Sequence, residues 1–407
     1  MTESLSISLV NGYLAHKQHL LPTSRHADVV QVTRDIVALH ATSATSPYLS
    51  LWARMPDFQR EILEDALYER RDLAKVLCMR VTVHAVPSDE APLFIRACQA
   101  YIERRTPTRF RGPGLLVQAG LCWEEEAEAL LQDLHSRVLD VLAEKGPSTV
   151  REIGQVVPEF KAKIRHDVGK PYEGAFSIGS RLVNSMSAWG LIIRARPRGS
   201  WRSSLYKYAA LSDWLPDIDL ESITPEEARS GVVRRYIAAF GPTTLDDIQW
   251  WTGFSKREMK EALEPLMPAL TELAIEGLGD GYLMLEDDAQ RLRGVTPPDA
   301  PYVFFLPSLD PYIMGYRDRR RFLAEKHYKK VFDRAGNALP TVWVNGRVVG
   351  AWGQLREDGS VIYGLFESLS EKEQALLADE AQRLETFLDG EFIKPAFFHT
   401  SFTRALK

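Results

Sequence analysis

The N-terminal part of the chain alternates between two periods of hydrophobic residues. Apolar side chains at helical spacing predict helices over Ser4–Gln18, Thr33–Leu39 and Arg60–Tyr68. From Leu73 to Val86 the sequence becomes rich in β-branched residues, which is typical of strands. Three helices followed by a β-element indicate one winged-helix unit, and the Gly/Pro-rich segment Thr106–Gly114 is predicted to be a linker.

The same order of patterns recurs twice further along the chain. The second round consists of predicted helices and then two strands around a basic turn: Glu125–Glu144, Val150–Val156, Ala175–Trp189, Leu191–Arg202 and Leu205–Tyr208. The third round has the same layout: Glu226–Phe240, Leu245–Thr252, Ser255–Leu266, Leu270–Ile275 and Tyr282–Glu286. Gly-Pro-Ser-Thr and Gly-Pro-Thr-Thr stand at the same place in the two rounds, which supports an internal repeat.

The last part of the chain has a different pattern. Tyr302–Leu306, Thr341–Val344 and Val348–Trp352 are apolar strands, and Asn345-Gly346 between the last two is a strong hairpin signal. The amphipathic segment Glu371–Leu388 is predicted to form a helix that packs on this sheet. We therefore predict an α+β fold with three tandem winged-helix units (residues 1–114, 115–220 and 221–298) and a β-rich C-terminal domain (299–407).

Composition narrows the class of protein. Its 407 residues exceed one ordinary core, and 45% hydrophobic with 26% charged residues is typical of folded soluble chains. No stretch has the apolar length of a membrane span and no signal peptide is evident, so we expect a cytoplasmic protein, monomeric and without membrane contact. Three scattered cysteines without CxxC spacing favour reduced core thiols over disulfides or a zinc site, and we expect no metal or cofactor.

Charge is unevenly distributed along the chain. The formal net charge of −5 disfavours phosphate binding unless basic residues gather on one face. One cluster without any acidic residue comprises Arg194, Arg196, Arg198, Arg202 and Lys207, with Trp201 among them. A second, containing Arg317, Arg319, Arg320, Arg321, Lys326, Lys329 and Lys330, is interrupted only by Asp318 and Glu325. Either cluster fits a nucleic-acid contact, and a solvated charged loop is the competing interpretation of the first.

Four segments resemble the AlkZ/YcaQ family of winged-helix DNA glycosylases, in an order that covers nearly the whole chain. The segments are Leu39–Thr42 leading into Ser46–Arg54, Leu67–Arg71 leading into Met79–His84, Leu309–Arg319, and Thr341–Trp352. The resemblance implies winged helices arranged in a C shape around duplex DNA, with the lesion left accessible. It also implies a monofunctional glycosylase of base excision repair that removes alkylated purines from double-stranded DNA and leaves an abasic site.

The catalytic motif of that family is usually Gln-x-Gln or Gln-x-Asp just before the Ser-Pro-Tyr segment. Here those two positions hold His40 and Thr42. A neutral imidazole can accept a proton from water and a threonine hydroxyl can orient the same water, so the pair is the candidate catalytic site. Local capping or backbone hydrogen bonds are the structural alternative for both residues. By the same resemblance, Tyr48, Trp52, Arg80, His84 and Asp310 are expected to support the site, the two aromatics as core residues.

An alkylated purine such as N7-alkylguanine carries a positive charge and is already a good leaving group. The enzyme therefore needs mainly to stabilise an oxocarbenium-like sugar and to aim a water at it. An open site would accept bulky adducts or crosslinks, and the His/Thr pair suggests specialisation in self-resistance to a DNA-alkylating toxin. Two alternatives stay open: a non-catalytic winged-helix transcription regulator, and an interaction scaffold without DNA contact.

Overall fold

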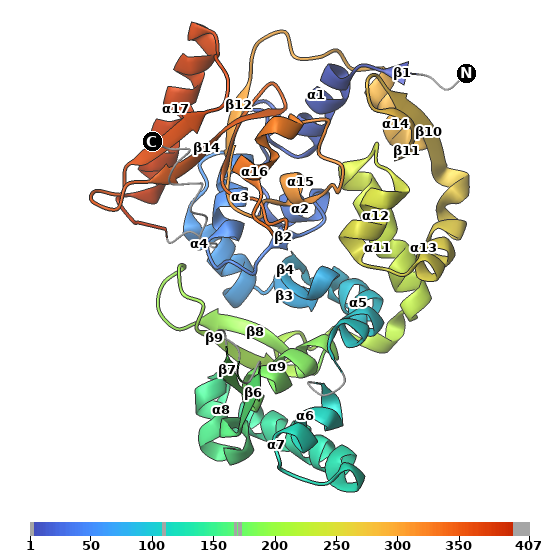
Figure 1. Cartoon of the computed structure of the whole chain (residues 1–407), viewed down its shortest axis with the longest axis vertical. Coiled ribbons are helices and arrows are strands. Elements are labelled where there is room, and N and C mark those ends of the chain that lie inside the picture. Colours follow the sequence, from blue (N-terminus) through green and yellow to red (C-terminus); the bar gives the residue numbers. More distant parts are fainter. Residues whose placement is uncertain (1–3, 108–110, 167–168, 170–172, 394–407) are drawn as a thin grey trace. The chain divides into compact units, whose positions relative to one another are not determined.

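The structure, a computed structural model, describes residues 4–107, 111–166, 169 and 173–393. Its elements divide into two compact units, which we call the first unit (residues 1–64 and 230–407) and the second unit (residues 65–229) (Figure 1). The chain is a mixture of helices and several separate sheets, as the α+β pattern of the sequence predicts.

The first unit holds two of these sheets. Its strands are β1 (Ser4–Leu5), β2 (Leu39–His40), β10 (Leu270–Ile275), β11 (Gly279–Leu285), β12 (Val303–Leu306), β13 (Thr341–Val344), β14 (Arg347–Gln354) and β15 (Val361–Leu365). Strand β1 runs parallel to β10, which pairs antiparallel with β11. The other sheet is an antiparallel meander in the order β12-β13-β14-β15.

The helices of the first unit come from both ends of the chain. They are α1 (Ile7–Lys17), α2 (Val29–Asp35), α3 (Ser46–Arg54), α4 (Arg60–Glu64), most of α11 (Pro225–Phe240), α12 (Leu245–Thr252), α13 (Lys256–Leu263), α14 (Glu286–Arg293), α15 (Pro311–Met314), α16 (Tyr328–Val331) and α17 (Glu371–Leu388). Helix α17 packs along the C-terminal sheet through β12 and β15, as predicted (Figure 1). The turn of the β13–β14 hairpin is confirmed at Asn345 and Gly346, whose φ angles are 50° and 73°.

The second unit surrounds one main sheet. Its strands β3 (Leu73–Cys78), β4 (Thr82–Pro87), β5 (Ser148–Thr149), β8 (Ile192–Pro197) and β9 (Tyr206–Ala210) lie in the order β4-β3-β8-β9-β5. A separate hairpin joins β6 (Lys163–His166) to β7 (Gly174–Ser177). The helices are α5 (Ala91–Arg105), α6 (Gly112–Gln118), α7 (Ala127–Lys145), α8 (Val150–Val156), α9 (Ile178–Ala188) and α10 (Leu211–Trp214).

Capping residues explain why several predicted boundaries are correct. Thr149 caps α8 and exchanges hydrogen bonds with Glu152, and Thr244 does the same for α12 with Asp247. The reciprocal pair fixes the first turn of each helix in both repeated rounds. Ser370 and Glu373 form the same box at the start of α17.

Other predicted elements differ from the structure. The strand-like run from Leu73 to Val86 is two strands, because the backbone reverses at Arg80 and Val81, which have positive φ without being glycine. The predicted helix Ala175–Trp189 starts only at Ile178, since the residues before it form β7. Helix α6 occupies part of the predicted linker Thr106–Gly114, whose residues 108–110 lie outside the described part of the chain. The predicted helix Thr33–Leu39 is shifted to α2, and β2 follows it.

Candidate active site and nucleic-acid interface

The segment that carries His40 and Thr42 begins at the end of α2. Val37, which follows the last turn of this helix, has φ 71° although its side chain is β-branched and buried. Glycine is the usual residue in this left-handed position, and a valine there costs roughly 1–3 kcal/mol of backbone strain. Strained residues of this kind cluster at functional sites, where the surrounding structure holds them in place.

The two candidate catalytic residues differ in exposure. His40 is the last residue of β2 and is 9% exposed, whereas Thr42, two residues later in the loop before α3, is exposed. The segment therefore holds an exposed threonine two residues after a largely enclosed histidine.

Helix α3, which follows this loop, is fixed by a buried charge network in the first unit. Arg54 donates to both carboxylate oxygens of Asp310, at 2.8 Å each, and both side chains are fully buried. Ser50 Oγ donates to Asp310 Oδ2 at 2.7 Å, and the backbone N–H of Tyr312 donates to Oδ1 at 2.9 Å. Four hydrogen bonds satisfy the carboxylate, as a buried charge requires.

This network joins two of the segments that the sequence singles out. Ser46 Oγ donates to the carbonyl oxygen of Ser308 at 2.8 Å, next to Leu309, another non-glycine residue with positive φ (61°). Helix α3 also contacts β2. Asp310 thus anchors the helix that follows the His40 and Thr42 segment, and its full burial keeps it from contact with a substrate.

The predicted core aromatics lie where the sequence places them. Tyr48 and Trp52 are 2% and 3% exposed. The guanidinium of Arg383 on α17 lies 3.8 Å from the centre of the Trp52 ring, and Glu380 binds Arg383 and Arg25. Both aromatics contribute packing around α3 rather than a surface for stacked bases.

In the second unit, His84 is an interior residue. It lies on β4 opposite Val76, and its Nδ1 is 3.4 Å from the Sγ of Cys78. Burial lowers the pKa of His84 to about 4, and the charge of Arg80 acts in the same direction. The imidazole is therefore neutral at physiological pH. Burial likewise raises the pKa of the Cys78 thiol to about 12, so this cysteine is not a reactive thiolate.

The cluster from Arg194 to Lys207 lies on β8, β9 and the turn between them, which together we call the basic hairpin. Near its base the cations contact other groups of the second unit. Arg194 lies 4.9 Å from the Tyr206 ring centre, and Arg196 lies 4.6 Å from that of Tyr68 while pairing with Glu69 at 2.9 Å. Trp201 is 6% exposed, so it is not a free stacking platform. Arg198 and Arg202 are exposed in the turn, and Arg198 has one ion pair, to Glu152 at 3.4 Å.

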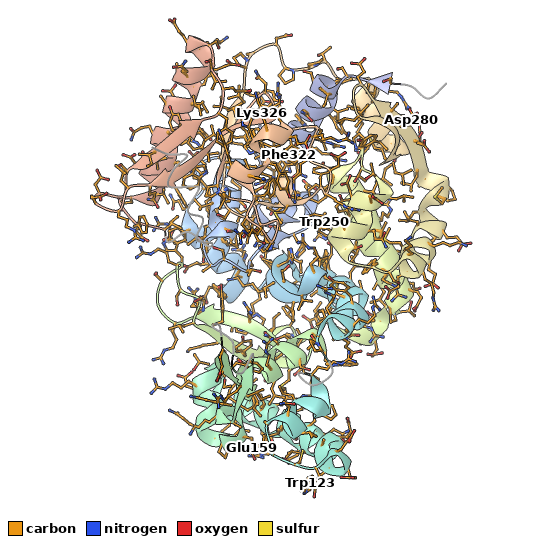
Figure 2. The ribbon with its side chains drawn as sticks, in the orientation of Figure 1. Trp123, Glu159, Trp250, Asp280, Phe322 and Lys326 are labelled. Carbon is orange, nitrogen blue, oxygen red and sulfur yellow. The ribbon has the colours of Figure 1, made fainter. Side chains whose placement is uncertain are left out.

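The second basic cluster, in the first unit, is split between interior and surface. Arg319 is 8% exposed and lies 3.9 Å from the Phe332 ring centre and 5.1 Å from that of Trp250. Arg321 is also buried and donates to the carbonyl oxygen of Pro242 at 2.7 Å. The side chains of Arg317 and Arg320 are 60% and 64% exposed. Lys326, which Figure 2 labels, is exposed together with Lys329 and Lys330.

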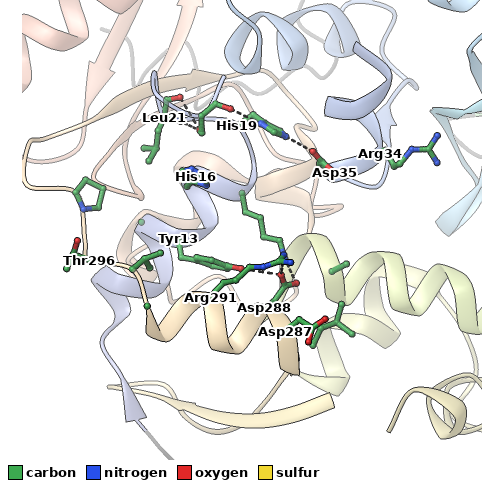
Figure 3. Close-up of a pocket in the computed structure, with 18 of the residues that line it drawn as sticks. Tyr13, His16, His19, Leu21, Arg34, Asp35, Asp287, Asp288, Arg291 and Thr296 are labelled. Atoms are coloured by element: carbon green, nitrogen blue, oxygen red, sulfur yellow. Dashed lines mark hydrogen bonds and ion pairs between the residues drawn. The ribbon is translucent and has the colours of Figure 1, made fainter. Parts of the chain in front are cut away.

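A cavity in the first unit was not foreseen from the sequence. It has a volume of about 830 Å³ and is lined from α1, α2, α11 and α14 (Figure 3). Asp288 accepts hydrogen bonds from Lys17 and from Tyr13, and His19 Nε2 lies 2.8 Å from Asp35 Oδ2. Burial lowers the pKa of Lys17. Lys17 and Tyr13 stand 271 and 275 residues from Asp288, and His19 stands 16 residues from Asp35, so no local pattern in the sequence signals these pairs.

Two further findings bear on cofactors and membranes. Within the described residues, no group of three or more His, Cys, Asp or Glu side chains is arranged to hold a metal ion. No helix there combines the length and apolar character that a bilayer span needs. All three cysteines are free, with Cys78 and Cys98 buried and Cys122 half-buried.

The family described as DNA glycosylase AlkZ-like matches residues 33–387, and the chain belongs to this family. The members of this family are described as DNA glycosylases, enzymes that hydrolyse N-glycosyl bonds in DNA.

Two relatives illustrate the similarity. The interstrand DNA cross-link repair glycosylase of Streptomyces sahachiroi is 30% identical over 132 residues, which is 31% of this chain and 34% of that protein. The match therefore spans about one third of this relative. The solved structure of Streptomyces sahachiroi DNA glycosylase AlkZ superposes with a TM-score of 0.72 at 19% identity, covering 96% of this chain and 98% of the other. The second likeness establishes the fold.

Proposed function

We propose that this glycosylase removes N7-alkylguanine-type purines, including bulky adducts or crosslinks, from double-stranded DNA and leaves an abasic site. The observation that carries the proposal is the pair His40 and Thr42 at the position of the family's catalytic motif, after the strained Val37. The name of the Streptomyces relative, a cross-link repair glycosylase, supports the substrate class. Self-resistance to a DNA-alkylating toxin is the role that would fit such a substrate.

The chemistry needs no group beyond those of the chain. The bond between C1′ and N9 of the cationic base breaks and its electron pair neutralises the base, leaving an oxocarbenium-like sugar. Water attacks C1′ while His40 accepts the proton that the water loses, and the hydroxyl of Thr42 orients the water. Because the base already carries the positive charge, no acid is required to protonate it. The anchoring of α3 by Asp310 keeps this segment in one position.

DNA contact is proposed for the exposed cations. These are Arg198 and Arg202 in the basic hairpin, and Arg317 and Arg320 in the first unit. Arg319 and Trp201 are left out because they are buried. The order of α7, β5, α8, α9, β8 and β9 supports a winged-helix unit, in which the hairpin serves as the wing.

The test is base release from a series of N7-guanine adducts of increasing size. His40→Ala is expected to lose about 100-fold or more in single-turnover rate, because general-base catalysis contributes roughly that much, and Thr42→Ala about tenfold. His16→Ala, an exposed histidine on α1, is the matched control and should release bases at the parent rate. Equal rates for His40→Ala and His16→Ala would rule out the catalytic pair. Release of methylated adducts as fast as bulky ones would rule out specialisation for bulky lesions, and no release of any adduct would rule out the substrate class.

A further inference from the structure

The turn of the basic hairpin exposes an apolar side chain together with two arginines. Leu205 is 66% exposed, the highest value after Trp123 (78%) among the large hydrophobic residues of the described chain. Arg198 and Arg202 are exposed in the same turn, and the whole hairpin contains no acidic residue. A single exposed leucine is ordinary on a protein surface, so its setting has to distinguish it.

The turn that carries Leu205 is internally hydrogen-bonded. The backbone N–H of Arg198 donates to the carbonyl oxygen of Leu205 at 2.8 Å, and that of Ser203 donates to Ser200 at 2.9 Å. Ser203 Oγ accepts from the N–H of Leu205 at 3.2 Å. Gly199, with φ 92°, allows the chain to reverse beside them. Leu205 is thus held outward by a preorganised turn.

The base of the hairpin is fixed as well. Tyr206, the neighbour of Leu205, is buried, with Lys75 Nζ at 5.1 Å and the Arg194 guanidinium at 4.9 Å from its ring centre. Arg194 is paired across the hairpin with Tyr208. A rigid base with a protruding apolar tip can deliver its side chain to a partner without paying a large ordering cost.

The positive charge near Leu205 favours a negatively charged partner such as DNA. Arginines suit phosphates, and proteins that kink DNA insert a leucine, methionine or phenylalanine between base pairs from the minor groove. An N7-guanine substituent lies in the major groove, so it would leave the opposite groove open to the hairpin.

We infer that Leu205 is a wedge that enters the duplex between adjacent base pairs, with Arg198 and Arg202 holding the phosphates on either side. The inference rests on the proposed function, since the duplex is its partner. Partial unstacking would expose the sugar of the damaged nucleotide to the attacking water. The wedge would give the basic hairpin a part in recognising lesions that already weaken base stacking.

The experiment measures base stacking directly. A duplex carries 2-aminopurine, which fluoresces when unstacked, next to an N7-methylguanine whose 2′-fluoro sugar resists base loss. Saturating parent protein is expected to raise the fluorescence about threefold or more, and Leu205→Ala to lose most of that rise while its Kd changes by less than about threefold, because the phosphate contacts remain. Leu205→Met should retain the rise.

The control variant is Trp123→Ala, which removes the other highly exposed apolar residue of the second unit. Trp123 lies just before α7, at the far end of the second unit from β8 and β9 (Figures 1 and 2). This variant should keep both the fluorescence rise and the affinity. A full rise with Leu205→Ala, or equal losses with Leu205→Ala and Trp123→Ala, would overturn the wedge.

Failure of the wedge is distinguishable from failure of the proposed function. If the parent protein binds the duplex and releases N7-alkylguanine but leaves 2-aminopurine stacked, the wedge is wrong. The proposed substrate class then stands. If it neither binds the duplex nor releases the base, the substrate proposal fails and the wedge fails with it.

Discussion

Buried arginines of the first unit and exposed arginines of the second unit differ in what they bind. In the first unit, Arg54, Arg319 and Arg321 are buried and bind a carboxylate, aromatic rings or a backbone carbonyl. In the second unit, Arg198 and Arg202 stand exposed in the turn of a hairpin. Arg319 and Arg321 belong to one basic cluster of the sequence and Arg198 and Arg202 to the other. The comparison teaches that a run of arginines indicates a nucleic-acid surface only where the fold leaves the guanidinium groups in water.

The hairpins β8–β9 and β10–β11 also differ in charge although their local architecture is similar. Hairpin β10–β11 follows α11, α12 and α13 as β8–β9 follows α7, α8 and α9, yet it carries Glu272, Glu276 and Asp280 and no basic residue between Leu270 and Leu285. Phosphates would be repelled there. The two hairpins therefore have similar local architecture but opposite surface charge. Of the two, only the basic hairpin has the charge that attracts phosphates.

The largest expected effect concerns the buried arginine. Arg54→Met removes one partner of a fully buried pair and leaves the carboxylate of Asp310 unneutralised, which should lower the free energy of unfolding by about 3–5 kcal/mol. Denaturant titration measures the free energy of unfolding of the parent and the variant. The double variant with Asp310→Leu should recover part of the loss, since no unpaired charge then remains.

The matched control is Arg137→Met on α7. Its partner Glu159 lies 2.9 Å away, but the Arg137 side chain is 35% exposed, and solvent screening should limit the loss to about 1 kcal/mol or less. Similar losses for the two variants would contradict the distinction between buried and exposed arginines.

The second effect concerns a buried histidine that is neutral in the folded chain. The folded pKa of His84 is about 4 against an ordinary 6.5, so the unfolded chain binds a proton between these values that the folded chain does not. Stability from this group is therefore complete above about pH 6.5 and falls as the pH drops to 4, by about 3 kcal/mol in total.

Unfolding free energy measured against pH should show this slope for the parent and not for His84→Gln. The exposed His16→Gln should retain the parental slope. An identical pH dependence in His84→Gln and the parent would show that the imidazole of His84 is not held neutral.

The third effect is on DNA affinity. Arg198→Ala with Arg202→Ala should weaken binding to duplex DNA by about tenfold at physiological salt, and should reduce the slope of log K against log salt by about 1.8, because two phosphate contacts are lost. Binding titrations over a salt series measure both. The control Arg257→Ala, an arginine of α13 whose side chain is 87% exposed, should change neither quantity.

The smallest expected effect concerns an exposed arginine of the first unit, Arg320. Asp318 holds Arg320 by an ion pair of 2.6 Å, which neutralises a proposed DNA contact. Asp318→Asn should therefore raise DNA affinity by about twofold. Asp133→Asn, which removes a comparable exposed partner of Arg137 on α7, should leave affinity unchanged, and a gain there of the same size would refute the local explanation.

Local sequence determined a large part of the fold. Thr149, Thr244 and Ser370 set helix starts through side chains three residues away, and Asn345-Gly346 set the β13–β14 turn through its positive φ angles. The candidate catalytic pair also came from sequence, through its place before the Ser-Pro-Tyr segment. These signals are short in range, so a single sequence displays them fully.

Only the tertiary structure decided which charged side chains lie inside. Asp310 stands 256 residues from Arg54, and Lys17 stands 271 residues from Asp288, so no local period reveals either pair. The turn at Arg80 and Val81 lacks the usual glycine or asparagine and is likewise imposed by its surroundings. Whether a charge is buried depends on every group packed around it, because the cost of removing it from water is repaid only by partners that the folded chain assembles.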